Sequence, residues 1–158
     1  ERRVESQPLS SGVAYMITSL LQSVVEEGTA KKIQSLKRPA AGKTGTTNNY
    51  KDAWFMGYTP ELLTGVWVGM DKDEPLGVNE TGSRTAIPIW LQYMRKVLAG
   101  TPIQNFPVSE EIVFTKINPK SGKLTNSDDP DGRFEVFLTS QLPEEHLDSE
   151  EIKVEDTF

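Results

Sequence analysis

Hydrophobic residues near the start of the chain recur at the spacing of one helical face. They are Val13, Met16, Ile17, Leu20, Leu21 and Val24, and this spacing predicts an amphipathic helix. Ser10 or Ser11 can cap its first turn, because a serine hydroxyl accepts a hydrogen bond from an otherwise unpaired amide. Gly28 follows the run, and we expect it to end the helix in the left-handed conformation.

Three short runs rich in aromatic and β-branched residues come next, over 40–47, 53–59 and 62–70. Pro60 and Glu61 separate the last two at hairpin distance. The pattern predicts three adjacent antiparallel strands.

A polar loop is expected over 71–84, followed by a second helix that starts near Pro88 and stops before Gly100. Its apolar face is predicted to comprise Ile87, Trp90, Leu91, Met94, Val97 and Leu98. Residues 112–117 and 135–139 are typical of two further strands. The order of elements predicts an α+β fold with helices flanking an antiparallel sheet.

These elements predict three regions along the chain. Residues 1–100 hold the first helix, the three strands and the second helix, residues 101–142 form a C-terminal β segment, and residues 143–158 form an acidic tail. The formal charge is −6, and the tail alone accounts for it with seven acids and one base. The remaining body is neutral, so we expect no nucleic-acid partner, which would require clustered Lys and Arg.

Several chemistries are excluded by composition. There is no cysteine, and the one histidine, His146, lies in the acidic tail, which argues against disulfides, thiolate catalysis, His-dependent pairs and zinc sites. Asp128, Asp129 and Asp131 have part of the spacing of a Ca²⁺ loop, but no Glu follows Gly132 at the required distance. We interpret them as a turn and expect neither a metal nor a cofactor. No apolar run is long enough to cross a membrane.

The sequence Gly42-Lys43-Thr44 admits two interpretations. In a nucleotide-binding P-loop a glycine stands five positions before the second glycine, and a helix begins at the Lys-Thr pair. Here Lys37 occupies that glycine position, and Lys43 is followed by Thr-Gly-Thr-Thr-Asn-Asn in the manner of a strand and a turn. The P-loop alternative would require ATP binding.

The second interpretation begins from Lys43-Thr44-Gly45, a tripeptide that β-lactamases and penicillin-binding proteins combine with Ser-x-x-Lys and Ser-Asp-Asn motifs. Lys43 supplies a cation beside an acyl-transfer site. Thr44 and Thr46 alternate to one face of a strand, where both hydroxyls can meet a carboxylate. Gly45 leaves room for whatever packs behind it. The amide of Thr46 can serve as an oxyanion-hole donor, and deleting one such donor costs about 3–4 kcal/mol.

The neighbouring residues carry a family resemblance. The stretch from Arg38 to Pro60, which contains KTGTTNNYKDAWFMGYT, closely resembles class A, bifunctional penicillin-binding proteins of the 1A type. The stretches GVWVGMD over 65–71 and TG…AIPIW over 81–90 do so as well. The resemblance is strong over residues 12–100 and looser over 112–143.

The resemblance implies a β-lactamase/transpeptidase-like sheet and a serine acyltransferase that cross-links peptidoglycan stem peptides ending in D-Ala-D-Ala and is acylated by β-lactams. It implies that Lys43 assists electrostatically and in proton movement, and that Thr44, Gly45 and Thr46 bind the terminal carboxylate. The amide of Thr46 would complete the oxyanion hole. It also implies a periplasmic location, with a membrane anchor and a glycosyltransferase domain outside this chain.

The chain departs from the family in one important respect, since it contains neither Ser-x-x-Lys nor Ser-x-Asn. We therefore expect the nucleophile and the general base to come from the N-terminal half of the same domain, and this chain to be inactive without it. The alternative is a non-catalytic module that binds cell-wall peptide or a protein partner.

The remaining prominent residues are interpreted as structural. Trp54, Phe55, Trp67 and Trp90 are expected in the core, because they occupy strand or helix interiors. Asp52 is expected to fix the turn after the motif strand, with orientation of Lys43 as the alternative.

Overall fold

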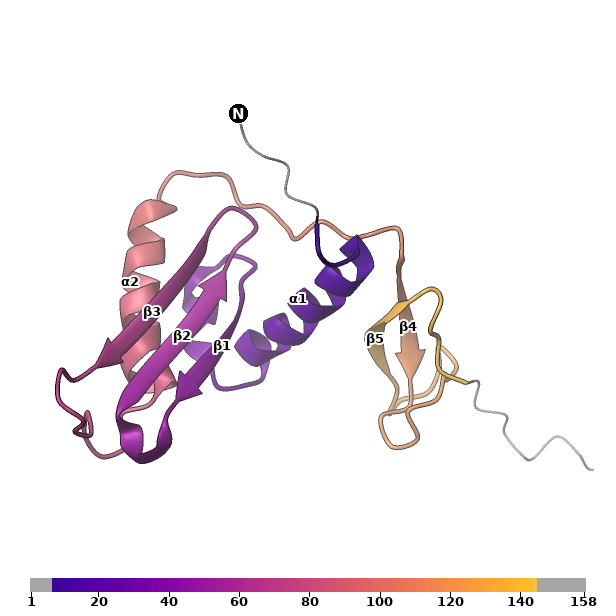
Figure 1. The fold of residues 1–158 in the computed structure, drawn as a ribbon. Coiled ribbons are helices and arrows are strands. Elements are labelled where there is room, and N and C mark those ends of the chain that lie inside the picture. Colours follow the sequence, from indigo (N-terminus) through magenta and orange to yellow (C-terminus); the bar gives the residue numbers. More distant parts are fainter. Residues whose placement is uncertain (1–6, 145–158) are drawn as a thin grey trace, which may run out of the picture. The chain divides into compact units, whose positions relative to one another are not determined.

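The computed structural model describes residues 7–144 of the chain, which divides into two compact units, Glu1–Val108 and Ser109–Phe158. The first unit contains α1 (Ser11–Glu26), η1 (Lys31–Leu36), β1 (Ala41–Thr46), η2 (Asn48–Tyr50), β2 (Asp52–Tyr58), β3 (Leu63–Gly69), η3 (Gly82–Ala86) and α2 (Ile87–Val97). The second contains β4 (Ile112–Ile117) and β5 (Arg133–Leu138). Figure 1 shows these elements. The α+β class predicted from the sequence is confirmed.

The start of α1 agrees with the prediction from the sequence, whereas its end differs from that prediction. The hydroxyl of Ser10 accepts a hydrogen bond from the amide of Val13 at 3.3 Å, which confirms the predicted cap. Gly28 does not adopt the left-handed conformation that we expected. Its amide donates to the carbonyl of Ser23, and a Cβ there would lie 2.9 Å from the Cα of Val24. This glycine is therefore required for close packing on the last turn of the helix and not for its dihedral angles.

The three predicted strands form one antiparallel sheet in the order β1-β2-β3. Gly45 of β1 lies opposite Trp54 of β2, which lies opposite Trp67 of β3. The β2–β3 hairpin is closed by backbone hydrogen bonds that Thr59 and Leu62 exchange, at 3.0 and 3.3 Å. The sheet and its hairpin therefore agree with the strand predictions.

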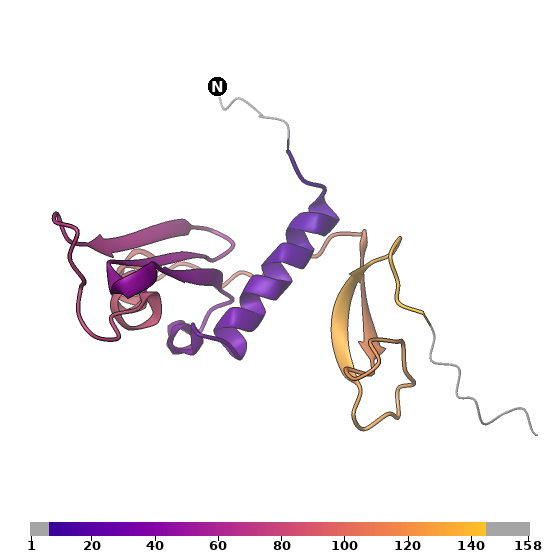
Figure 2. The same cartoon turned by 60° about the horizontal axis from the view of Figure 1, so that its bottom comes forward.

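One face of the sheet is covered by α2, and the core lies between them (Figure 2). Its largest fully buried side chains are Trp90, Phe55, Ile33, Ile87 and Met94. The rings of Phe55 and Trp90 meet edge to face with centroids 5.3 Å apart, a favourable aromatic arrangement.

The second helix corrects the sequence prediction in two places. Residues Gly82–Ala86, expected to complete a loop or lead into the helix, form the π-helical turn η3, which runs directly into α2. Val97, expected on the buried face, is 45% exposed. Ile89, Tyr93 and Val97 instead share a second, exposed apolar flank, because residues four apart lie on one side of a helix.

The opposite face of the sheet lies open in the part of the first unit that the structure describes (Figure 2). Trp54 and Trp67, which we expected in the core, are 43% and 52% exposed, and their rings lie 6.1 Å apart. Successive strand residues point to opposite faces, so Phe55 is buried while its neighbour Trp54 is not. The assignment of both tryptophans to the core was wrong because aromatic content alone does not distinguish the faces.

The apolar stripe of α1 is likewise incompletely buried. Gly12 and Val25 are the buried residues of this helix, whereas Ile17 and Leu20 are 42% and 68% exposed. The helix is therefore amphipathic as predicted, but much of its apolar side does not contact the rest of the unit.

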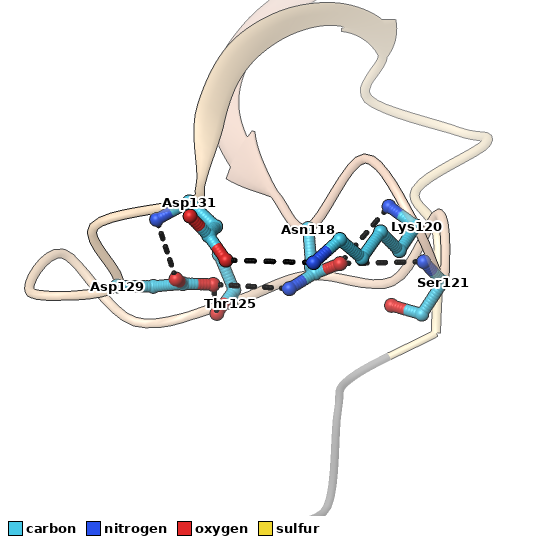
Figure 3. A network of polar contacts seen from close by, with 6 residues as sticks. All are labelled: Asn118, Lys120, Ser121, Thr125, Asp129 and Asp131. Carbon is cyan, nitrogen blue, oxygen red and sulfur yellow. Dashed lines mark hydrogen bonds and ion pairs between the residues drawn. The ribbon is translucent and has the colours of Figure 1, made fainter.

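The second unit is an antiparallel pair of strands with Val113 opposite Phe137, and none of its described residues is buried. A polar network closes the loop between the strands, as Figure 3 shows in part. The ammonium of Lys116 donates to the carbonyls of Ser127 and Asp129, both at 2.7 Å. The Asp129 carboxylate accepts from the hydroxyl of Thr125 at 2.8 Å. The acidic tail predicted for 143–158 lies outside the described residues from residue 145 onward.

No helix among residues 7–144 combines the length and apolar character needed to cross a membrane.

The opposite burial of two neighbouring residues predicts unequal effects on stability. Phe55→Ala should lower the free energy of unfolding by about 3–5 kcal/mol, because it removes a fully buried ring and leaves a cavity. Trp54→Ala, on the open face, should cost no more than about 1.5 kcal/mol. Urea unfolding followed by circular dichroism measures both, and equal losses would contradict the assigned faces.

The network around Asp129 predicts a pH dependence of the second unit. The Thr125 hydroxyl is the main cause that lowers the pKa of Asp129, with further lowering by the Asp131 amide, Asn118 and the charge of Lys116. A carboxyl whose pKa is lower in the folded state stabilises the fold above its unfolded pKa, and that stability is lost as pH falls through the folded pKa. The variant Asp129→Asn should therefore lose no stability from this group as the pH is lowered. Amide exchange of residues 118–132 at neutral and at acidic pH measures the change in stability, with Asp128→Asn as the control.

Candidate active-site strand

The Lys-Thr-Gly-Thr sequence lies on β1, an edge strand that pairs with β2 alone among the described residues. Lys43 and Gly45 point to the open face of the sheet, in register with Met56 and Trp54. Thr44 and Thr46 share the opposite face, opposite Phe55 and Ala53. The predicted alternation of the two threonines is therefore present, and Lys43 points to the other side.

The backbone of β1 turns selected amides toward its unpaired edge. The amide of Thr47, just after the strand, donates to the carbonyl of Asp52 at 3.1 Å and so points to β2. Because successive residues direct their amides to opposite edges of an antiparallel strand, the amides of Thr44 and Thr46 face away from β2. This orientation leaves the Thr46 amide free of strand pairing, as an oxyanion donor must be.

The two glycines of the strand lie under neighbouring side chains. A Cβ at Gly45 would be 3.2 Å from the Cβ of Trp54, and one at Gly42 would be 2.6 Å from the ring of Phe55. Trp54 therefore packs across Gly45 on the open face. The sequence predicted that Gly45 leaves room for a neighbouring group, and that group is Trp54. Lys43, beside it, is exposed, and its ammonium donates to the carbonyl of Thr44 at 2.9 Å.

Two residues from distant segments hold the threonine hydroxyls. Thr29, between α1 and η1, shares a hydrogen bond with Thr44 at 3.1 Å between the hydroxyl oxygens. The amide of Gly82, at the start of η3, donates to the hydroxyl oxygen of Thr46 at 3.1 Å. Since that amide occupies one acceptor position of the oxygen, the Thr46 proton remains available to donate to a carboxylate.

Sequence reasoning did not identify Thr29 or Gly82 as parts of the site. Gly82 lies 36 residues from Thr46 in the chain, and no local pattern connects them. A signal for Gly82 does exist in the structure, because a Cβ there would be 2.8 Å from the Gly45 carbonyl and 3.1 Å from the Cβ of Thr44. Only glycine allows this segment to lie against the back of the motif strand.

The turn after the motif depends on Asp52. Its carboxylate accepts from the Thr47 hydroxyl at 3.1 Å and from the indole N–H of Trp67 at 2.8 Å. The Asp52 amide donates to the Thr47 hydroxyl oxygen at 2.8 Å. The predicted role of Asp52 in the turn is confirmed, since these contacts bridge both ends of the 47–52 segment.

The P-loop alternative conflicts with the backbone. Residues Ala41–Thr46 form an extended strand, whereas a P-loop needs a helix that begins at Lys43 and Thr44. The only helical residues that follow closely are the short turn Asn48–Tyr50, where Asn49 has a left-handed conformation. In the part of the chain that the structure describes, no three carboxylate or histidine side chains gather as metal ligands would.

Comparison with known proteins defines the class. Residues 1–95 match the family model described as the penicillin binding protein transpeptidase domain, and this match covers more than half of the chain. The chain belongs to that family.

Individual relatives are penicillin-binding proteins 1A. The chain is 40% identical over 136 residues to that of Pseudomonas aeruginosa, covering 85% of this chain and 16% of the relative. It is 48% identical over 101 residues to the penicillin-binding protein 1A of Aquifex aeolicus, and the match covers 64% of this chain and 14% of the relative. The crystal structure of penicillin-binding protein 1A from Haemophilus influenzae superposes with a TM-score of 0.79 at 34% identity, covering 88% of this chain and 22% of that one. The chain thus spans less than a quarter of each of these three proteins, and its transpeptidase-like fold is confirmed.

Close packing at Gly82 predicts that a methyl group there displaces η3 from β1. Gly82→Ala should cost about 1–3 kcal/mol of stability and break the 3.1 Å bond to Thr46. Arg84→Ala changes an exposed residue of the same turn and should cost less than about 0.5 kcal/mol. Thermal unfolding measures the stability, and amide exchange at residue 82 reports the bond. Equal behaviour of the two variants would show that η3 does not rest on the strand as described.

Proposed function

We propose that this chain is the C-terminal part of a peptidoglycan D,D-transpeptidase that works by serine acyl transfer and is acylated by β-lactams. In this proposal Lys43 assists proton movement and stabilises negative charge, while Thr44, Gly45 and Thr46 bind the terminal carboxylate of a D-Ala-D-Ala stem peptide. The full-length protein would act in the periplasm, held to the membrane by a segment outside these residues.

The observation that carries the proposal is the unpaired edge of β1. A peptide laid along this edge would meet the Thr46 amide, which is free of strand pairing, and the Thr46 hydroxyl, whose proton is free to donate because Gly82 occupies an acceptor position. Backbone donors placed in advance where an oxyanion develops are a large source of rate acceleration in acyl transfer. No nucleophile of the Ser-x-x-Lys type is present in the sequence, so the attacking serine must be supplied by another part of the domain.

Three exposed apolar surfaces of the first unit support the proposal that another part of the protein packs against it. The α1 stripe with Leu20, the α2 flank with Tyr93 and the sheet face with Trp67 are all substantially exposed. The outer edge of β3 has no strand partner among the described residues. Exposed apolar patches of this kind mark surfaces that contact another protein part, and an unpaired strand edge accepts another strand. We propose that the N-terminal half of the same domain covers them.

This proposal predicts how the protein responds to fluorescent penicillin. The chain alone should show no covalent labelling, because it has no serine nucleophile of the required type. With the N-terminal half co-expressed, labelling should appear, and Lys43→Ala should slow it at least about a hundredfold, the scale of lost proton-transfer catalysis. Gel fluorescence after timed incubation measures the rate.

Lys72→Ala serves as the matched control, since it removes another exposed lysine, from the loop after β3. Labelling of the isolated chain would overturn the assignment of the nucleophile to another part of the domain. Unchanged labelling by the Lys43 variant would remove Lys43 from the catalytic groups. Reversible binding of a D-Ala-D-Ala peptide without any labelling of the reconstituted domain would instead favour a binding module.

A further inference from the structure

A groove lies between η1 and α2, outside the motif strand. It has a volume of about 740 Å³, and its lining includes Lys32, Pro88, Leu91, Arg95 and Lys96. This volume is too large for a single ion and suits several side chains of a bound segment. The lining combines an apolar floor, from Pro88 and Leu91, with three cationic groups.

The positive charge of this region is uncompensated in sequence. No acidic residue occurs between Gly28 and Lys51, or between Thr81 and Ser109, and these two segments include all the elements that line the groove. Among the described residues the ion pairs are those of Arg38, Lys51, Lys120, Lys123 and Arg133. Lys32 and Lys96 are not in that set, and both are exposed. The groove therefore presents free cationic groups to solvent.

Arg95 is already oriented toward the groove. Its guanidinium donates to the hydroxyl of Ser35 on η1 at 2.6 Å, which fixes the side chain across the gap between the two elements. A guanidinium held in this way keeps further N–H donors for a carboxylate and loses less conformational entropy on binding one.

The two flanks of α2 have different chemistry. Ile89, Tyr93 and Val97 form an apolar flank, which suits burial against the rest of the domain. Arg95 and Lys96 lie on the groove side, where burial without partners would be costly for charged groups. Arg95 and Lys96 therefore need water or an acidic partner at this groove.

We propose that this groove is a docking site for an acidic peptide segment of a partner protein. Aspartate or glutamate side chains of the segment pair with Lys32, Arg95 and Lys96, and an apolar side chain between them rests on Pro88 and Leu91. The combination of an apolar floor with three separate cationic groups favours a peptide that carries both apolar and acidic side chains. The site is independent of the transpeptidase chemistry proposed for β1.

The test measures binding of labelled peptides to the 158-residue chain by fluorescence anisotropy. An eight-residue peptide of alternating Glu and Leu is compared with its Gln counterpart, at low and at physiological salt. The acidic peptide should bind at least about tenfold more tightly, and its affinity should fall as salt rises. Vesicles with and without anionic lipid, examined by co-sedimentation, provide the membrane comparison.

The variant Lys32→Gln/Lys96→Gln removes two charges without touching the Arg95–Ser35 contact, and it should weaken the acidic peptide about threefold to thirtyfold. Lys72→Gln/Lys120→Gln makes the same charge change outside the groove and should leave binding within about twofold. Circular dichroism spectra must match for all variants. Equal binding of the Glu and Gln peptides, equal weakening by the two double variants, or binding of anionic vesicles without the peptide would each overturn the proposal.

Discussion

The indole N–H of Trp90 connects the second helix to the sheet. It donates to the carbonyls of Gly57 on β2 and Thr64 on β3, at 3.2 and 3.1 Å, and the ring itself is fully buried. These bonds and the contact with Phe55 determine which face of the sheet is interior. Because side chains alternate along a strand, the same choice places Thr44 inward and Lys43 outward. The geometry of the candidate site therefore follows from the packing of one helix.

Much of this fold could be predicted because its signals are local. The spacing of apolar residues in α1 and the short Pro60-Glu61 connection act within a few residues of the chain, and both predictions were confirmed. The core status of Trp54 could not be obtained in this way. Its neighbour Phe55 has similar composition around it, and the two differ only in which face of the sheet is covered. That depends on which face of the sheet α2 packs against.

The candidate site also contains residues that the sequence could predict and residues that it could not. Lys43 and Thr46 could be proposed as site residues from the motif and its neighbours, since the motif consists of consecutive residues. Thr29 and Gly82 contact these threonines from segments that the folded chain brings together, and no periodicity connects such positions. The unburied stripe of α1 was also invisible in the sequence, where Leu20 has the spacing of a buried residue although it is largely exposed. An amphipathic pattern indicates that a helix packs against something without indicating what.

The packing around the glycines of β1 restricts how this strand can vary over evolution. A Cβ at Gly42 would lie 2.6 Å from the ring of Phe55 and 2.7 Å from the carbonyl of Met56, and Gly45 is covered by Trp54. A side chain at Gly42 would meet the backbone of Met56 as well as the Phe55 ring, so a smaller ring alone would not make room for it. A side chain at Gly45 would press on the Cβ of Trp54, which every residue except glycine also has. Substitution is consequently easier at a position whose side chain reaches solvent, such as Lys43, than at the glycines that shape the backbone presenting the Thr46 amide.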